Sequence, residues 1–191
     1  ILLPGRLTAW KGQEMFLDAL NKVNIQLGND AFIAVILGND QGRDLYKKKL
    51  IRLVEQYRLT KQIRFIDHCK NMPLAYKISD IVISASIEPE AFGRVSVEAQ
   101  SMQKMIVASN LGGSNETVID GKTGILFEAG NSDELSEKII KVMNMDPNEI
   151  SKMGNNGREN VLKKFNVEKM CFSTYSCLLY TSPSPRDLRK S

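Results

Sequence analysis

The chain has 191 residues, of which 42% are hydrophobic and 25% carry a charge, as is typical of one ordinary globular domain with a single core. Its net charge of +4 is too small, without a clustered basic face, to predict a nucleic-acid partner. No apolar run approaches the ~18 residues that would span a bilayer.

Strand-like and helical segments alternate along the chain. Strands are expected at residues 1–3, 32–37, 63–66, 81–85, 105–109 and 124–127. Helices are expected at 13–27, 44–57, 73–78 and 94–102, and then consecutively at 133–145, 147–165 and 167–176. This alternation predicts an α/β fold: a Rossmann-like, doubly wound parallel sheet covered on both faces, followed by C-terminal helices.

The connection after the first strand carries two cations between glycines. Arg6 offers a planar fork that can bind two phosphate oxygens, and Lys11 offers a compact charge. Gly5 and Gly12 allow the loop to fold back close to a ligand. We therefore expect this loop to bind phosphate groups.

Two glutamates, Glu90 and Glu98, flank a Phe92-Gly93 step where the fourth predicted strand gives way to a helix. The first N–H groups of that helix have no partner within it, so they can receive a phosphate or sugar oxygen. One carboxylate can then reach each end of a nucleotide-sugar. The alternative interpretation is that Glu90 is a solvated loop residue and Glu98 a residue on the helix surface, neither with a role in binding. A glycoside hydrolase is disfavoured, because its two carboxyls must flank one bond.

No Asp-x-Asp pair, histidine cluster or cysteine pair with ligand spacing occurs in the chain, so no metal is expected. Cys69 and Cys171 are expected to be free thiols in a reducing, cytoplasmic compartment. The single histidine, His68, is interpreted as a loop residue after the third strand.

A third glycine-rich block follows the fifth strand, at 112–116, with a second turn at 120–124. With the two blocks above, in the same order and spacing, it resembles the C-terminal, donor-binding domain of retaining nucleotide-sugar glycosyltransferases of the GT-B fold, family 4 (glycosyl transferases group 1). Residues 90–98 match that family's Glu-x7-Glu motif. The resemblance extends from residue 1 to about residue 176.

The resemblance implies a role for each matching residue. Arg6 and Lys11 would bind the donor's diphosphate, and Glu98 would accept hydrogen bonds from the ribose hydroxyls. Glu90, with the backbone of Phe92 and Gly93, would hold the transferred sugar. The remaining matched positions would present N–H groups to the distal phosphate or line the same cleft: Arg94, Val95, Gly5, Gly112 and Gly113.

The implied activity is hexosyltransferase-type: retaining transfer of a sugar from a nucleoside-diphosphate sugar, with UDP favoured, to a glycan or lipid-linked acceptor. The resemblance implies no cofactor or metal. It also implies polysaccharide or lipopolysaccharide assembly in the bacterial cytoplasm, and it is compatible with peripheral association at the inner membrane face. The acceptor would bind an N-terminal domain that this chain lacks, so the fragment alone would be inactive. The final helix would brace that domain. A GT-B-like phosphorylase or epimerase and a non-catalytic nucleotide-binding module are the alternatives.

Two features depart from the family's pattern. Gln103 and Met105 stand where Gly and Pro are common, at the turn before the fifth strand. Residues 177–191 break the helical pattern and contain a run of Pro and Ser. They are predicted to be either the translation of a sequencing-library adapter or a disordered tail. The donor-binding domain is therefore expected to cover residues 1–176.

Overall fold

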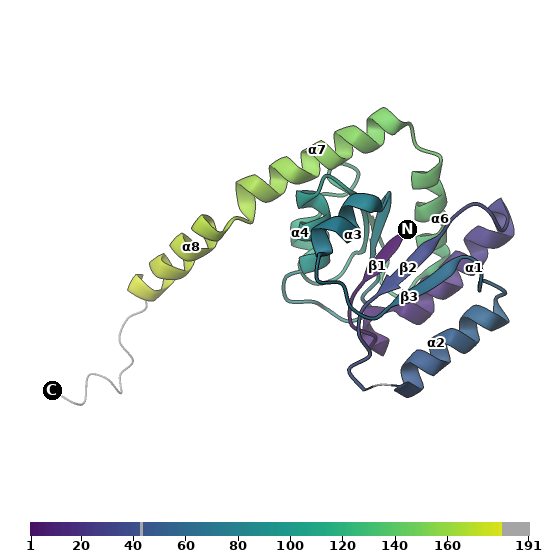
Figure 1. Cartoon of the computed structure of the whole chain (residues 1–191). Helices are drawn as coiled ribbons and strands as arrows, with labels where there is room; N and C mark the ends of the chain where they lie inside the picture. The colour runs from purple at the N-terminus through teal and green to yellow at the C-terminus, as the bar shows by residue number, and fades with distance from the viewer. Residues whose placement is uncertain (43, 181–191) are drawn as a thin grey trace.

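The computed structural model describes residues 1–42 and 44–180, which form one layered α/β domain with a helical arm (Figure 1). All strand pairs in its six-stranded sheet are parallel, and the strand order is β3-β2-β1-β4-β5-β6. The strands are β1 (Leu2–Pro4), β2 (Ala34–Leu37), β3 (Ile63–Ile66), β4 (Ile81–Ser84), β5 (Met105–Ser109) and β6 (Ile125–Phe127).

Helices connect these strands and then continue past the sheet. They are the 3-10 helix η1 (Ala9–Lys11) and the α-helices α1 (Gln13–Leu27), α2 (Asp44–Gln56), α3 (Met72–Ile78), α4 (Arg94–Ser101), α5 (Gly113–Thr117), α6 (Ser132–Met143), α7 (Pro147–Lys164) and α8 (Val167–Tyr180).

The sheet is buried on both faces because successive strand residues point in opposite directions. Leu3 of β1 belongs to a core formed with α1, α2 and α6, whereas its neighbour Leu2 belongs to a second core with Tyr76 of α3 and Ala99 of α4. Both residues are at most 4% exposed. The continuous apolar strands of the sequence therefore reflect two cores, one on each side of the sheet.

The direction of the connections reverses between β1 and β4. From β1 the chain proceeds outward through β2 and β3, returns through α3 to pair β4 with the other side of β1, and continues outward through β5 and β6. Helices α1 and α4, which follow these two strands, pack in the cores on opposite faces of the sheet. Ligands of open α/β sheets bind at such points.

The predicted α/β class is confirmed, and β3, β5 and α1 have the predicted bounds. Most other elements begin or end one or two residues from the predicted position, and η1 and α5 were not predicted. Local capping explains the starts of two helices, α7 as predicted and α6 one residue before its predicted start. The Asn131 side chain accepts a hydrogen bond from the Glu134 N–H at 3.0 Å, and Pro147 occupies the first turn of α7.

The predicted end of the last helix at residue 176 is wrong. Helix α8 continues to Tyr180, because residues 177–180 contain neither glycine nor proline and the first proline of the tail is Pro183. The rest of the predicted tail, residues 181–191, lies outside the described residues.

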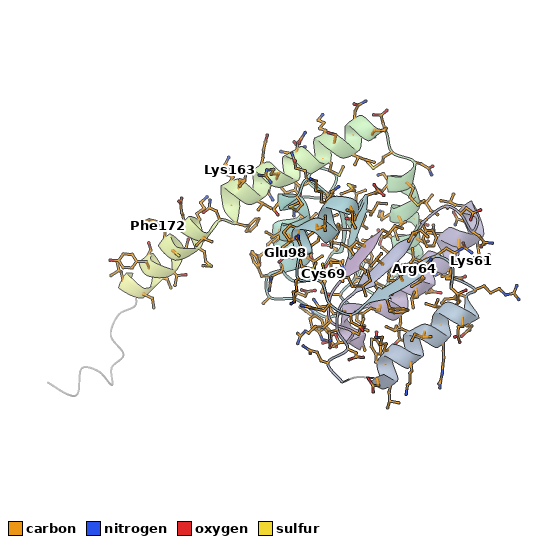
Figure 2. All side chains as sticks on the ribbon, viewed as in Figure 1. Lys61, Arg64, Cys69, Glu98, Lys163 and Phe172 are labelled. Atoms are coloured by element: carbon orange, nitrogen blue, oxygen red, sulfur yellow. The ribbon has the colours of Figure 1, made fainter. Side chains whose placement is uncertain are left out.

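Helix α8 projects from the domain as an arm beyond α7 (Figure 1). Its large apolar side chains are exposed, Phe172 (Figure 2) by 71% and Val167 by 70%. Within residues 1–42 and 44–180, no helix is both long and apolar enough to cross a membrane.

The turn between α4 and β5 contains Gln103, which stands where the family's pattern commonly has glycine. The backbone of Gln103 has a φ of 57°, in the left-handed region that favours glycine. The turn is closed by a hydrogen bond of 2.9 Å from the Lys104 N–H to the Ala99 carbonyl. The family's common glycine would suit this conformation, which Gln103 adopts with some strain.

Candidate functional site

The three predicted blocks meet at the carboxyl edge of the sheet. The loops after β1 and β4 are joined by a hydrogen bond of 2.8 Å from the Ile87 N–H to the Trp10 carbonyl. The loops after β4 and β5 are joined by one of 2.7 Å from the Gly113 N–H to the Glu90 carbonyl. Because β1, β4 and β5 are adjacent strands, segments more than a hundred residues apart in sequence form one site.

Lys11 and Glu90 form an ion pair within this site. The Lys11 Nζ lies 2.7 Å from the Glu90 Oε1, and the two side chains are only 13% and 15% exposed. The Ser86 hydroxyl donates a hydrogen bond to the same carboxylate oxygen. The Lys11 ammonium also lies 4.4 Å from the centre of the Trp10 ring, a cation–π contact. These contacts give Lys11, the last residue of η1, a defined position.

Both carboxylate oxygens of Glu98 accept hydrogen bonds. Its Oε1 accepts a hydrogen bond from Arg94 Nη2 at 2.9 Å, one helical turn earlier. Its Oε2 accepts a hydrogen bond from the Tyr76 hydroxyl at 2.7 Å, and this tyrosine belongs to α3. Burial raises the pKa of the Tyr76 hydroxyl well above its usual value, and the Glu98 carboxylate raises it further.

Close backbone contacts require glycine at two positions of these loops. A Cβ on Gly12, whose φ is 72°, would lie 1.9 Å from the Ala85 carbonyl oxygen at the end of β4. A Cβ on Gly113 would lie 2.3 Å from the Phe92 carbonyl carbon. Both separations are far shorter than van der Waals contact. The two glycines let the loops of β1 and β5 pack against the loop of β4.

Helix α4 begins in this site with unused donors. Gly93 precedes it in a left-handed conformation, with a φ of 73°. No described residue accepts a hydrogen bond from the backbone N–H of Arg94 or Val95. Such N–H groups at a helix N-terminus, together with the helix dipole, favour an anion.

The remaining predicted residues lie around this centre. Gly5 packs against the aliphatic part of Lys11, with 3.6 Å between the position of a Gly5 Cβ and the Lys11 Cδ. The Arg6 side chain is exposed and forms no salt bridge with any described residue. The Phe92 ring makes an edge-to-face contact with Phe165, with 5.8 Å between the ring centres. Gly112 adjoins the Glu90 backbone.

Charge in the site is nearly balanced. Arg6, Lys11 and Arg94 are cationic and Glu90 and Glu98 are anionic, which leaves one net positive charge. Each carboxylate has its own cation, Lys11 for Glu90 and Arg94 for Glu98. An anionic ligand at this edge would therefore meet paired carboxylates and the exposed Arg6, and electrostatic repulsion by the acids would be reduced.

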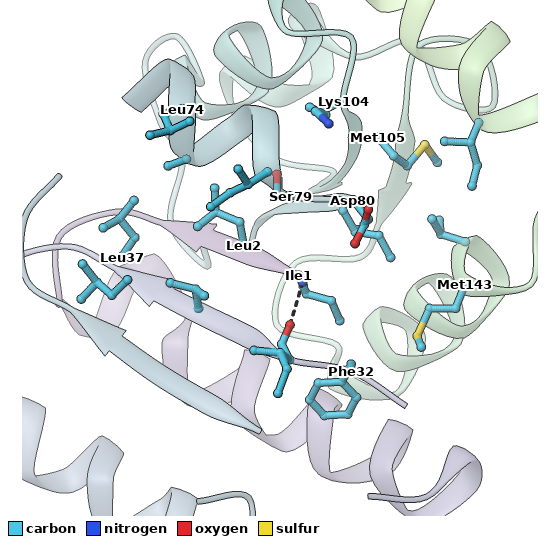
Figure 3. Close-up of a pocket in the computed structure, with 18 of the residues that line it drawn as sticks. Ile1, Leu2, Phe32, Leu37, Leu74, Ser79, Asp80, Lys104, Met105 and Met143 are labelled. Carbon is cyan, nitrogen blue, oxygen red and sulfur yellow. Dashed lines mark hydrogen bonds between the residues drawn. The ribbon is translucent and has the colours of Figure 1, made fainter. Parts of the chain in front are cut away.

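A groove of about 970 Å³ lies elsewhere, lined by α3, by residues along β1 and β2 and by the start of β5 (Figure 3). It is lined mainly by apolar side chains, including Leu2, Leu37 and Leu74. None of the predicted site residues lines it. His68 lines this groove from the loop after β3, which confirms its interpretation as a loop residue.

Within the described part of the chain, no three His, Cys, Asp or Glu side chains are grouped so as to hold a metal ion. Cys69, Cys171 and Cys177 are free thiols.

Two residues of the site were not predicted, Tyr76 and Ser86. Ser86 lies four positions before Glu90, and this proximity was the available signal. Tyr76 is 22 positions from Glu98 and belongs to another helix. Its contact depends on how α3 and α4 pack on the sheet, so no local pattern could reveal it.

Comparison with known proteins identifies the family to which the chain belongs. The family described as glycosyl transferases group 1 matches residues 1–160. The chain belongs to this family. Like its GT-B relatives, this glycosyl transferases group 1 domain has a Rossmann-like parallel sheet.

Solved structures of similar glycosyltransferases match nearly all of the chain. A glycosyltransferase from Rickettsia africae is 31% identical, with a TM-score of 0.86 over 95% of this chain and 48% of that one. HepE from Anabaena, solved in complex with UDP and glucose, is 29% identical, with a TM-score of 0.83 over 93% of this chain and 47% of that one.

A shorter sequence match is to the capsular polysaccharide biosynthesis glycosyltransferase CapM from Staphylococcus aureus. It is 39% identical over 79 residues, which are 41% of this chain and 20% of CapM. The glycosyl transferases group 1 domain described here spans about half the length of the two solved structures.

Proposed function

We propose that this chain is the donor-binding half of a retaining glycosyltransferase, covering residues 1–176, which transfers a hexose from a UDP-sugar to a glycan or lipid-linked acceptor. The observation that carries the proposal is the meeting of the Lys11–Glu90 pair, the Arg94–Glu98 pair and the start of α4 at one sheet edge. The HepE complex with UDP and glucose supports a UDP-sugar, and the name of CapM supports a polysaccharide acceptor.

The cations and the α4 N-terminus would act on the leaving group. Arg6 and Lys11, with the N–H groups of Arg94 and Val95, would stabilise the negative charge that develops on the departing diphosphate. The Lys11 ammonium has three donors and uses one for Glu90, so it can bind a phosphate oxygen without releasing that carboxylate. No metal is needed in this mechanism.

Glu90 would orient the sugar instead of attacking it. One of its oxygens already accepts hydrogen bonds from Lys11 and Ser86, which lowers its nucleophilicity and leaves Oε2 for a sugar hydroxyl. The backbone of Phe92 and Gly93 borders the same space, while Gly112 and Gly113 close it. Glu98, on the far side of the α4 N-terminus, would accept hydrogen bonds from the ribose.

Acceptor binding belongs to a part of the enzyme outside this chain, in this proposal. The exposed apolar side chains of α8 support its role as a brace against that part. The isolated chain would then bind the donor and transfer sugar slowly or not at all. In the cell the enzyme would act in the cytoplasm, at the inner face of the membrane where lipid-linked acceptors are found.

Calorimetric titration of the chain with UDP, GDP and ADP, each with and without a chelator, tests the proposal. We expect UDP to bind best and to be insensitive to the chelator. Arg6→Ala and Glu98→Ala should each weaken UDP binding about ten- to hundredfold, the usual scale for lost hydrogen bonds to charged groups.

Arg64→Ala is the matched control for Arg6→Ala, because Arg64 is also exposed but lies on the edge strand β3 (Figure 2). It should leave UDP binding unchanged. A folded chain that binds none of the three nucleotides would contradict the proposed donor site. Binding that the chelator abolishes would contradict the metal-free mechanism alone.

A further inference from the structure

We infer that Tyr76 is a positioning residue for the donor nucleotide: its hydroxyl holds Glu98 in the orientation that receives the ribose. This inference rests on the proposed function, because it requires a nucleotide at this site. It adds a residue from α3, an element that contains none of the predicted site residues.

Tyr76 is itself fixed in place. Only 2% of the residue is exposed, and its ring packs in the second core. Its carbonyl accepts hydrogen bonds from the Ser79 N–H at 3.1 Å and the Ser79 hydroxyl at 2.8 Å, which close the end of α3. The hydroxyl therefore extends toward Glu98 from a rigid base, at an O–O distance of 2.7 Å.

Glu98 needs such a constraint. Its side chain is 35% exposed and has three rotatable bonds, and its other contact is Arg94, whose side chain is 82% exposed. An exposed ion pair restrains a glutamate weakly. The buried phenol is a firmer anchor because its own conformation is already set by packing, so little further entropy is lost when the hydrogen bond forms.

The geometry leaves Glu98 able to bind a diol. An ionised carboxylate has about four acceptor sites, and Arg94 and Tyr76 use one on each oxygen. One site on each oxygen is left, which suits two neighbouring ribose hydroxyls. Because burial keeps the Tyr76 pKa high, the phenol keeps its proton at neutral pH and remains a hydrogen-bond donor.

A comparison of two nucleotides separates positioning from packing. Tyr76→Phe keeps the ring and removes only the hydroxyl. We expect it to weaken UDP binding about three- to tenfold in calorimetry, since an orienting hydrogen bond contributes less than a direct one. Binding of 2′,3′-dideoxy-UDP, which has no ribose hydroxyls for Glu98 to receive, should be the same in Tyr76→Phe and the unchanged chain.

Tyr57→Phe is the matched control. The Tyr57 hydroxyl also contacts a carboxylate, at 3.4 Å from the Asp18 Oδ1, but between α2 and α1 on the other face of the sheet. Tyr57→Phe should change the affinity for neither UDP nor 2′,3′-dideoxy-UDP. Tyr76→Met, which fills similar space without a donor, should reproduce the selective loss and provides a second test should Tyr76→Phe fold poorly.

Three results would overturn the inference. If Tyr76→Phe binds UDP as tightly as the unchanged chain, the hydroxyl does not position Glu98, and the proposed donor site still stands. If both nucleotides lose affinity equally, Tyr76 acts only through packing. If the unchanged chain binds no UDP, the proposed function itself fails and this inference with it.

Discussion

Each acid of the site is tied to a basic side chain and to a hydroxyl. Glu90 contacts Lys11 and Ser86, and Glu98 contacts Arg94 and the Tyr76 phenol. The pairing restrains two carboxylates at an edge that, in the proposed function, also accepts a diphosphate. In the proposed mechanism the Lys11 ammonium binds both the Glu90 carboxylate and the diphosphate. The position of this ammonium therefore matters more than its charge alone.

The Lys11–Glu90 pair can be tested by a double-mutant cycle in urea unfolding. Lys11→Met should lower the free energy of unfolding by about 1–2 kcal/mol, because it leaves a largely buried carboxylate without its cation. Glu90→Gln in the same chain should recover most of that loss, which gives a coupling of about 1 kcal/mol. Additive effects of the two substitutions would show that the pair is not formed in solution.

Among the elements, helix α4 connects the site to the rest of the domain. Its first turn supplies N–H groups, its second turn supplies Glu98, and buried Ser96 and Gln100 face the loops after β5. Helix α7 packs closely on its far end: a Cβ on Gly154 would lie 2.4 Å from the Gln103 carbonyl oxygen. The turn at Gln103 therefore sets how α4 ends and how α7 approaches.

Gln103→Gly should stabilise the domain by about 0.5–1 kcal/mol. Glycine removes the strain of a side chain at a φ of 57°, and this gain exceeds the loss of an exposed hydrogen bond from Gln103 Nε2 to Asn155. Thermal unfolding measures the difference. Gln103→Ala, which loses the same hydrogen bond but keeps the Cβ, is the control and should destabilise slightly. A glycine variant no more stable than the alanine variant would refute the strain.

For the whole molecule, the division between domain and arm has consequences for stability. The two cores are built from the sheet and from helices α1–α4, α6 and α7, whereas α8 contributes no residue to either of them. Exposed apolar side chains on an arm are typical of a surface that is covered by another part of a larger assembly.

Removal of residues 167–191 should change the free energy of unfolding by less than about 0.5 kcal/mol, as for changes away from a packed core. It should also reduce self-association, measured by sedimentation velocity. The double substitution Met170→Glu and Phe172→Glu in the full chain should reduce self-association similarly, because these positions are 62% and 71% exposed. A loss of stability above about 2 kcal/mol on truncation would show that α8 folds back onto the domain.

The sequence by itself determined the order and type of most elements. Apolar strands such as Ile81–Ser84 and amphipathic helices such as Gln13–Leu27 carry their periodicity locally, and glycine and proline mark several of their ends. The motif residues Arg6, Lys11, Glu90 and Glu98 could be selected in the same way, because each follows or begins a recognisable element. The predicted end of α8 was four residues too early. The polar, proline-rich residues that follow Tyr180 outweighed residues 177–180, which are compatible with a helix.

Only the tertiary structure decided which of these residues touch. The contact of Lys11 with Glu90 spans 79 positions, and that of Tyr76 with Glu98 joins two helices. Both follow from strand order and helix packing, which arise from burial summed over the whole domain and are not encoded in any short segment. The sequence could name the charged groups of the site, but the pairing of Lys11 with Glu90 became known only when the sheet placed β1 beside β4.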